Sequence, residues 1–216
     1  MTKAPLFNPA PRKIYHEQKP ERVQAVVSRR PLPVTGGEAA MTNRDTVPSD
    51  APPVPPRASR TEWYMNIAVE TARRSTCIRR CYGAVVVNFA GEIVSTGHNG
   101  APRGEAHCDE LNTCIRKQYN IPSGERYEFC RSVHAEMNAL LQAGRAAAGC
   151  TMYLAGFERL TGAPSYDPPC LMCSKMLVNA GIGRVVVRTP DGLRELDPQE
   201  LYRKHLDSVI AKVSGK

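Results

Sequence analysis

Two short runs of residues constrain the fold of this 216-residue chain more than any other feature. One run is His134-Ala135-Glu136, and the other is Pro169-Cys170-Leu171-Met172-Cys173. Each opens a segment with helical apolar spacing, so each is expected at the start of a helix. The imidazole and the two thiols can share one ion only if the fold brings these two helix starts to the same edge of a sheet.

The hydrophobic pattern predicts such a sheet. Helices are expected from near Thr61, at 135–145, at 170–180 and at 198–213, and strands at 83–88, 92–96, 151–155 and 184–188. The first two strands form a predicted hairpin, and the later strands are joined through helices and run parallel. The order α-β-β-α-β-α-β-α predicts an α/β fold with one mixed sheet and helices on its faces.

The first 58 residues differ in composition from the rest of the chain. They hold 11 of the 18 prolines and few apolar side chains, which favours extended, unfolded backbone. We therefore expect a disordered, basic, proline-rich tail over 1–58 and a single folded domain over 59–216.

Net charge and hydropathy limit the kinds of molecule that this chain is expected to bind. Residues 61–216 hold 19 Lys or Arg and 16 Asp or Glu, a net charge of +3. So small a positive excess fits a small anionic substrate and argues against an extended binding surface for a nucleic acid. The chain lacks the apolar run of about 18 residues that a membrane span needs, and it lacks a signal-peptide pattern, so we expect it in the cytoplasm.

The residue types in the two runs suit catalytic zinc. One imidazole and two thiolates leave a tetrahedral zinc ion with one open position, and Cys170 and Cys173 are three apart, on one side of a helical turn. Glu136 is placed near the metal without binding it, where it can take a proton from an activated water and return it to the substrate. The pattern H-x-E followed by P-C-x-x-C is typical of zinc-dependent base deaminases. A zinc-stabilised interaction module without turnover is the alternative.

A second group of thiols suggests a structural metal. Cys77, Cys108, Cys114 and Cys130 bracket a polar segment, 98–130, that is long for a loop without something to hold it. A tetrathiolate zinc would hold it, whereas the alternative is that these thiols are small buried apolar groups. Cys81 and His107 are substitute ligands for this second zinc, and Cys150 is expected in the core.

Over about residues 62–190 the chain resembles the bacterial dCMP deaminase family, including its late-competence type. The matching runs are 75–80, 95–102, 107–108, 121–126, 130–139 and 169–182. The resemblance implies a three-layer α/β/α sandwich with a mixed central sheet, like that of cytidine deaminase. It also implies the hydrolysis of dCMP to dUMP and ammonia, which feeds thymidylate synthesis, and a homo-oligomer.

The resemblance also implies roles for single residues. It makes His134, Cys170 and Cys173 the catalytic zinc ligands and Glu136 the proton shuttle. Asn99 falls in a loop that contacts nucleotide in the family.

Two further sets of residues are assigned less directly. Cys77 and Cys108 match second-zinc positions in some members of the family, and extending that set to Cys114 and Cys130 follows from the residues alone. Arg131 and Arg103 are candidates for the substrate phosphate, because a guanidinium fork matches phosphate oxygens.

Three departures from the family pattern bear on the substrate. His98 stands where the family usually has tyrosine, in a loop associated with nucleotide regulation. Segment 157–168 is longer than usual, and 80–83 reads Arg-Cys-Tyr-Gly in place of Arg-Gln-Val-Gly. Deamination of cytidine, or of a base in tRNA or single-stranded nucleic acid, therefore remains an alternative, although the few aromatic residues near the motifs argue against a polynucleotide.

Overall fold

The computed structural model describes residues 56–215. The predicted tail therefore lies outside the described residues except for its last three, and 56–59 form neither helix nor strand. None of the helices in the described range is both long and apolar enough to cross a membrane.

The centre of the fold is a mixed sheet. Its strands are β1 (Arg80–Val87), β2 (Ile93–His98), β3 (Thr151–Glu158), β4 (Pro164–Ser165), β5 (Arg184–Thr189) and β6 (Gly192–Leu196), in the order β2-β1-β3-β5-β6 with β4 paired to β3. The predicted hairpin is the antiparallel pair β1–β2, and β3 and β5 run parallel as predicted. Strand β6 was not predicted from the sequence, because it is a short, mostly exposed edge strand that leaves little apolar signal.

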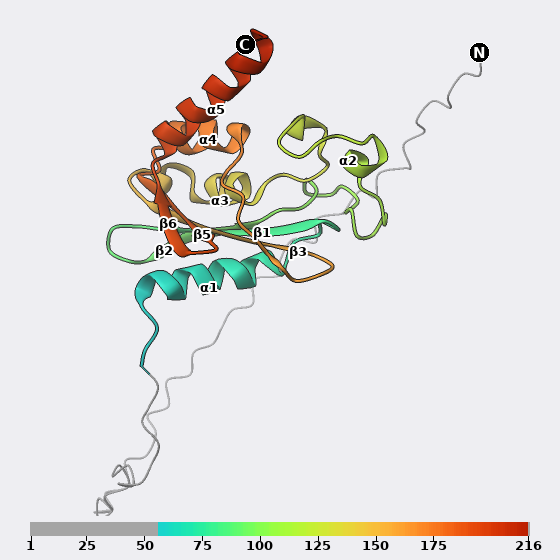
Figure 1. Cartoon of the computed structure of the whole chain (residues 1–216). Coiled ribbons are helices and arrows are strands. Elements are labelled where there is room, and N and C mark those ends of the chain that lie inside the picture. Colours follow the sequence, from blue (N-terminus) through green and yellow to red (C-terminus); the bar gives the residue numbers. More distant parts are fainter. Residues whose placement is uncertain (1–55, 216) are drawn as a thin grey trace, which may run out of the picture. The chain divides into compact units, whose positions relative to one another are not determined.

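Helices cover both faces of this sheet, which confirms the three-layer α/β/α architecture (Figure 1). The helices are α1 (Arg60–Ala72), α2 (Ile115–Gln118), α3 (Ala135–Ala143), α4 (Leu171–Asn179) and α5 (Pro198–Val213), with two short 3-10 turns, η1 (Tyr127–Phe129) and η2 (Gly144–Ala147). Helix α1 lies on one face, α3 and α4 lie on the other, and α5 packs against α4. The Ser59 hydroxyl caps α1, and the Asp197 carboxylate caps α5.

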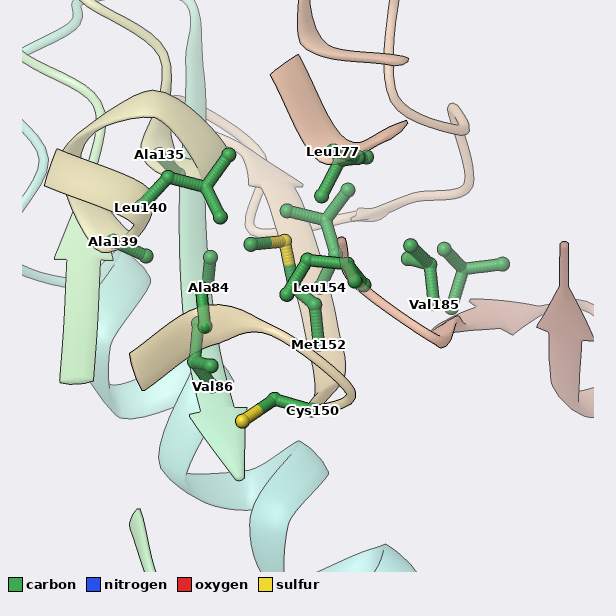
Figure 2. Packing of buried hydrophobic residues seen from close by; sticks show 13 residues of the cluster. Ala84, Val86, Ala135, Ala139, Leu140, Cys150, Met152, Leu154, Leu177 and Val185 are labelled. Carbon is green, nitrogen blue, oxygen red and sulfur yellow. The ribbon is translucent and has the colours of Figure 1, made fainter. Parts of the chain in front are cut away.

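Alternation along the strands builds two separate cores. Val86, Met152 and Leu154 point into the core beneath α3 and α4, shown in Figure 2, where the predicted core residue Cys150 is also buried. Their neighbours Val85 and Tyr153 point to the opposite core, beneath α1. Because each fully buried side chain of this size stabilises the fold by about 1.5–3 kcal/mol, both faces of the sheet are strongly held.

Two glycines allow the helices to approach the sheet closely. A Cβ at Gly83 would lie 2.1 Å from the carbonyl oxygen of Ala68 in α1, and one at Gly97 would lie 2.3 Å from the backbone nitrogen of Ala139 in α3. Any side chain at Gly97 would therefore push α3 off β2. This contact matters for function because α3 begins immediately after His134.

Candidate active site

The fold brings the two helix starts together. His134 is the N-cap of α3 and Cys170 is the N-cap of α4. The His134 Nδ1 atom lies 3.5 Å from the Cys170 Sγ atom and 3.4 Å from the Cys173 Sγ atom. Imidazole and thiolate ligands of one tetrahedral zinc ion lie about 3.5 Å apart, so these three side chains fit zinc.

This set stands apart from the rest of the described chain. Its three ligand atoms all lie within 4.8 Å of one another, and no other group of three His, Cys, Asp or Glu residues in 56–215 meets that criterion. We call His134, Cys170 and Cys173 the helix-start set.

The electrostatics of the two thiols also favour a cation. A hydrogen bond from the Cys173 thiol, with a further contribution from His134, lowers the pKa of Cys170 to about 4. The same shared proton, together with burial, raises the pKa of Cys173. The shared proton and the nearby helix N-terminus, which stabilises negative charge, together favour a thiolate at Cys170.

Glu136 lies in the first turn of α3 and is 5% exposed. Burial raises the pKa of its carboxyl group, which brings the group closer to the range in which a carboxylate exchanges protons efficiently at neutral pH. It lines the same cavity as His134 and Cys170. This position allows Glu136 to act on a water molecule or a substrate in the cavity without coordinating the metal.

The cavity is a concave space between β1, the 99–132 segment and the two helix starts. Its other walls are formed by Cys77, Arg79, Arg80, Tyr82, Asn99, Cys114, Arg116, Ser123, Tyr127, Cys130, Ser132, Ala135, Leu154, Asp167 and Pro168. It is lined by apolar and polar groups together, as is usual for small-molecule sites. A substrate entering this cavity would reach Glu136 and the helix-start set together.

Asn99 lines the cavity and also ties the loop after β2 to β1. Its Oδ1 atom accepts a hydrogen bond of 2.8 Å from the backbone N–H of Tyr82, and its Nδ2 atom donates one of 2.9 Å to the carbonyl oxygen of Arg80. The side chain is 7% exposed. Its contact with nucleotide stays a prediction, while its structural role is visible.

The predicted phosphate ligands lie elsewhere. Neither Arg103 nor Arg131 is among the residues that line the cavity, which instead has Arg79, Arg80 and Arg116 in its walls. Both predicted arginines lie in the irregular segment between β2 and α3, where spacing along the sequence gives no guide to direction.

The three arginines of the cavity differ in what they bind. Arg116 donates hydrogen bonds to the carbonyl oxygens of Pro122, Glu125 and Arg126 and stacks on Tyr127, so it holds the loop together. Arg80 is paired with two carboxylates, described below.

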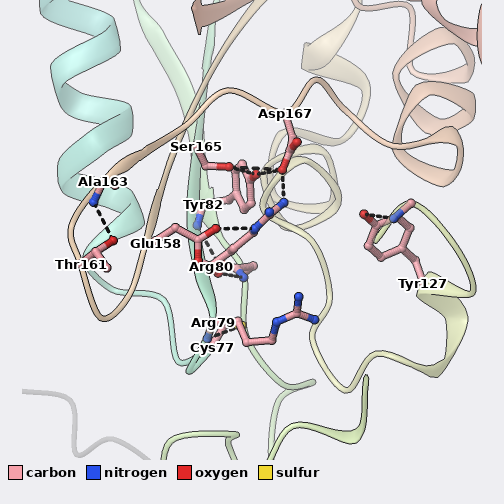
Figure 3. Close-up of polar contacts among 12 residues, drawn as sticks. Cys77, Arg79, Arg80, Tyr82, Tyr127, Glu158, Thr161, Ala163, Ser165 and Asp167 are labelled. Atoms are coloured by element: carbon pink, nitrogen blue, oxygen red, sulfur yellow. Dashed lines mark hydrogen bonds and ion pairs between the residues drawn. The ribbon is translucent and has the colours of Figure 1, made fainter. Parts of the chain in front are cut away.

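Arg79 is the third arginine in the cavity wall. Its guanidinium forms no hydrogen bond or ion pair within residues 56–215, and Figure 3 shows it diverging from Arg80. Its place two residues after Cys77, inside one of the runs that match the family, is the sequence signal that could have found it.

Ser132 is a second residue that sequence reasoning missed. Its side chain is 8% exposed, it lines the cavity, and its Oγ atom has no hydrogen-bond partner among the described residues. A buried hydroxyl without a partner costs about 1–3 kcal/mol. A ligand in the cavity could offset that cost.

The four loop cysteines, Cys77, Cys108, Cys114 and Cys130, lie near one another but do not form a closed site. We call them the loop set. Burial, and then the proximity of the other three thiols, raises the pKa of Cys108 to about 11. No three of the four sulfur atoms fall within 4.8 Å of one another in the described chain.

The two substitute ligands are engaged elsewhere. The His107 Nδ1 atom lies 3.1 Å from the Thr76 hydroxyl, and the buried Cys81 thiol donates to the carbonyl oxygen of Cys77 at 3.9 Å. A second zinc site therefore stays a prediction.

Two deoxycytidylate deaminases are similar to this chain in sequence. A deoxycytidylate deaminase of Schizosaccharomyces pombe is 35% identical over 133 residues, which cover 62% of this chain and 38% of the yeast protein. A deoxycytidylate deaminase of Mycobacterium phage D29 is 39% identical over 132 residues, 58% of this chain and 91% of the phage protein. The chain thus spans well under half of the yeast relative and most of the phage relative.

Among solved structures, the apo dCMP deaminase of cyanophage S-TIM5 matches with a TM-score of 0.44 and 25% identity, over 67% of this chain and 90% of that one. The family described as "Cytidine and deoxycytidylate deaminase zinc-binding region" matches residues 58–189, which include the helix-start set and Glu136. The chain therefore belongs to the cytidine and deoxycytidylate deaminase zinc-binding family.

Proposed function

We propose that this protein is a zinc-dependent hydrolase that converts dCMP to dUMP and ammonia. The observation that carries the proposal is the convergence of His134, Cys170 and Cys173 at ligand distance, with the buried Glu136 in the same cavity. Both relatives described above, from yeast and phage, are deoxycytidylate deaminases, which supports the choice of substrate.

His134, Cys170 and Cys173 would hold the ion. When bound, zinc acts as a Lewis acid that activates a water molecule near neutral pH. Glu136 would accept one proton from the attacking water and pass it to the ring nitrogen, and it would then carry a second proton from the added hydroxyl group to the amino group that leaves as ammonia. Its burial keeps bulk water away from this transfer.

The phosphate of the substrate would lie against Arg79. Arg79 is the cavity arginine whose guanidinium is free within the described chain, and a charge-assisted hydrogen bond to phosphate contributes about 1.5–3 kcal/mol. Asn99 and Ser132 lie in the walls of the same cavity and would contact the nucleotide.

The remaining parts of the proposal extend beyond this cavity. Residues 59–216 would form the deaminase domain, preceded by a basic tail. The loop set would bind a second, structural zinc, because four thiols that influence one another's pKa lie beside an irregular segment. The enzyme would act as a homo-oligomer in the cytoplasm on a free nucleotide.

A steady-state assay of ammonia release tests the proposal. The zinc-loaded full chain is offered dCMP, CMP, deoxycytidine, dCTP, cytosine and a tRNA in parallel. We expect dCMP to give the highest kcat/KM, with deoxycytidine well below it. Equal rates on dCMP and deoxycytidine would contradict a nucleotide substrate, and binding without turnover of any compound would favour a non-catalytic zinc module.

A further inference from the structure

The Tyr82 side chain extends across a neighbouring strand of the sheet. Tyr82 of β1 pairs with Gly156 of β3, which in turn pairs with Ser165 of β4. The Tyr82 ring lies directly over Gly156, where a Cβ would be 2.4 Å from the ring. The Tyr82 hydroxyl therefore crosses β3 and lies 2.5 Å from the Ser165 Oγ atom (Figure 3).

This row of residues fixes Asp167 by one of its two carboxylate oxygens. The Oδ2 atom lies 2.9 Å from the Tyr82 hydroxyl and 3.2 Å from the Ser165 hydroxyl, and it also binds the Arg80 guanidinium. Because the two hydroxyls share a hydrogen bond with each other, one of them donates its proton to this oxygen. The Oδ1 atom takes no hydrogen bond from any residue between 56 and 215. Asp167 lines the cavity with Tyr82 and Arg80, so it presents a fixed acceptor there.

The charge of this wall selects what can bind to it. Arg80 also pairs with Glu158 at 2.7 Å, so one guanidinium serves two carboxylates and the group carries a net negative charge. Burial raises the pKa of Tyr82, which keeps its hydroxyl a donor at neutral pH. A phosphate would be repelled from this wall, whereas a neutral hydrogen-bond donor would be attracted.

A cytosine nucleotide offers two kinds of donor, the amino group of the base and the hydroxyls of the sugar. The amino group must lie at the helix-start set, because it leaves as ammonia beside Glu136. The sugar hydroxyls remain for Asp167. In dCMP the 5′ oxygen carries the phosphate and the 2′ position has no hydroxyl, so the donor is the 3′-hydroxyl.

We infer that Asp167 is a specificity residue whose free carboxylate oxygen accepts a hydrogen bond from the 3′-hydroxyl of the substrate sugar, and that Tyr82 and Ser165 position it. The inference rests on the proposed function and deepens it. It also joins two departures from the family pattern, Tyr82 and the long 157–168 segment, into one structural unit, since the segment supplies Ser165 and Asp167.

The test compares dCMP with 2′,3′-dideoxyCMP, which lacks only the 3′-hydroxyl. We expect wild-type protein to prefer dCMP by roughly tenfold or more in kcat/KM, mostly through KM, as for other charged hydrogen bonds. Asp167→Ala is expected to bring this ratio close to one, and Asp167→Asn, which keeps an acceptor, to restore part of it. Tyr82→Phe should give an intermediate ratio, because it removes a bond that positions Asp167.

Glu158→Gln is the matched control. Glu158 binds the same guanidinium but is not among the residues that line the cavity, so this variant should keep the wild-type ratio. Zinc content and Tm of each variant show whether it is folded.

Each other outcome decides against the inference. An unchanged ratio in a folded Asp167→Ala protein would overturn it. A lower KM for dCMP in that variant would show instead that Asp167 masks Arg80 as a phosphate ligand, which also overturns it. If wild-type protein turned over dCMP with no preference over the dideoxy compound, the inference alone would fail, whereas no turnover of dCMP at all would overturn the proposed function as well.

Discussion

The helix-start set and the loop set both consist of side chains that bind zinc well, yet the fold holds them in different ways. His134 and Cys170 each cap a helix that is pressed against the sheet, and their ligand atoms meet at 3.5 Å. The four thiols of the loop set, Cys77 among them, come from irregular backbone between strands and helices and stop short of ligand distance.

The contrast between the two sets shows under which condition a sequence motif alone determines the positions of metal-ligating side chains. In the helix-start set, the direction of each side chain follows from the helix that it begins, and the helix is fixed by burial of residues such as Ala139 and Leu177. In the loop set, Arg116 braces the loop between Cys114 and Cys130, but no helix fixes the direction of the thiols, so an ion would be needed to bring the sulfur atoms to ligand distance. We therefore expect catalysis to depend on the first set and the order of the 98–130 segment to depend on the second.

The largest expected effect belongs to Glu136. Glu136→Gln keeps the size of the side chain and removes its ability to carry a proton, so we expect ammonia release from dCMP to fall by roughly 10²–10⁴-fold. Zinc content measured by atomic absorption should stay at the wild-type value. Near-wild-type turnover would show that the helix-start set works without this carboxylate.

Exchange of one cysteine from each set separates the two sites. We expect Cys170→Ala and Cys108→Ala each to lose one zinc ion of two. Only the second should lower Tm steeply, by roughly 10 °C or more, because structural zinc contributes several kcal/mol to folding. A Cys108→Ala protein with wild-type metal content and Tm would reduce the loop set to buried apolar thiols.

Arg79 tests whether the loop side of the cavity binds the phosphate. Arg79→Ala should lower kcat/KM for dCMP by roughly tenfold to 100-fold, the value of a charge-assisted hydrogen bond, and leave deoxycytidine nearly unaffected. Arg103→Ala and Arg131→Ala are matched controls, since both remove a guanidinium outside the cavity. A phosphate-selective loss in either control would restore the expectation drawn from the sequence.

The smallest effect is expected at Ser132. Ser132→Ala removes a buried hydroxyl that has no partner in the described chain, so Tm should stay the same or rise slightly. KM for dCMP should increase by roughly fivefold, the usual value for one lost neutral hydrogen bond. A fall in Tm with unchanged KM would mean that the hydroxyl serves the fold and not the ligand.

The sequence was sufficient for four of the six strands, for the helices over the faces of the sheet and for the convergence of His134 with Cys170, because each follows from periodicity and from helix starts. The sequence was not sufficient to predict which arginines line the cavity. Arg79 and Arg103 look alike as residues, and only the path of the loops decides which one enters the cavity.

The hydrogen bond between Tyr82 and Asp167 could not be predicted from the sequence either. The two residues lie 85 positions apart, and they meet through the two-residue strand β4, which is too short to leave a periodic signal. The sequence marked both places as departures from the family pattern but gave no sign that they touch.

A zinc anomalous difference map from crystals of the full chain tests the helix-start set most directly. The structure predicts a peak about 2.0–2.1 Å from the His134 Nδ1 atom and about 2.3 Å from the sulfur atoms of Cys170 and Cys173, with one coordination position open to the cavity. A zinc-loaded crystal without a peak there, or with a fourth protein ligand closing that position, would contradict the account.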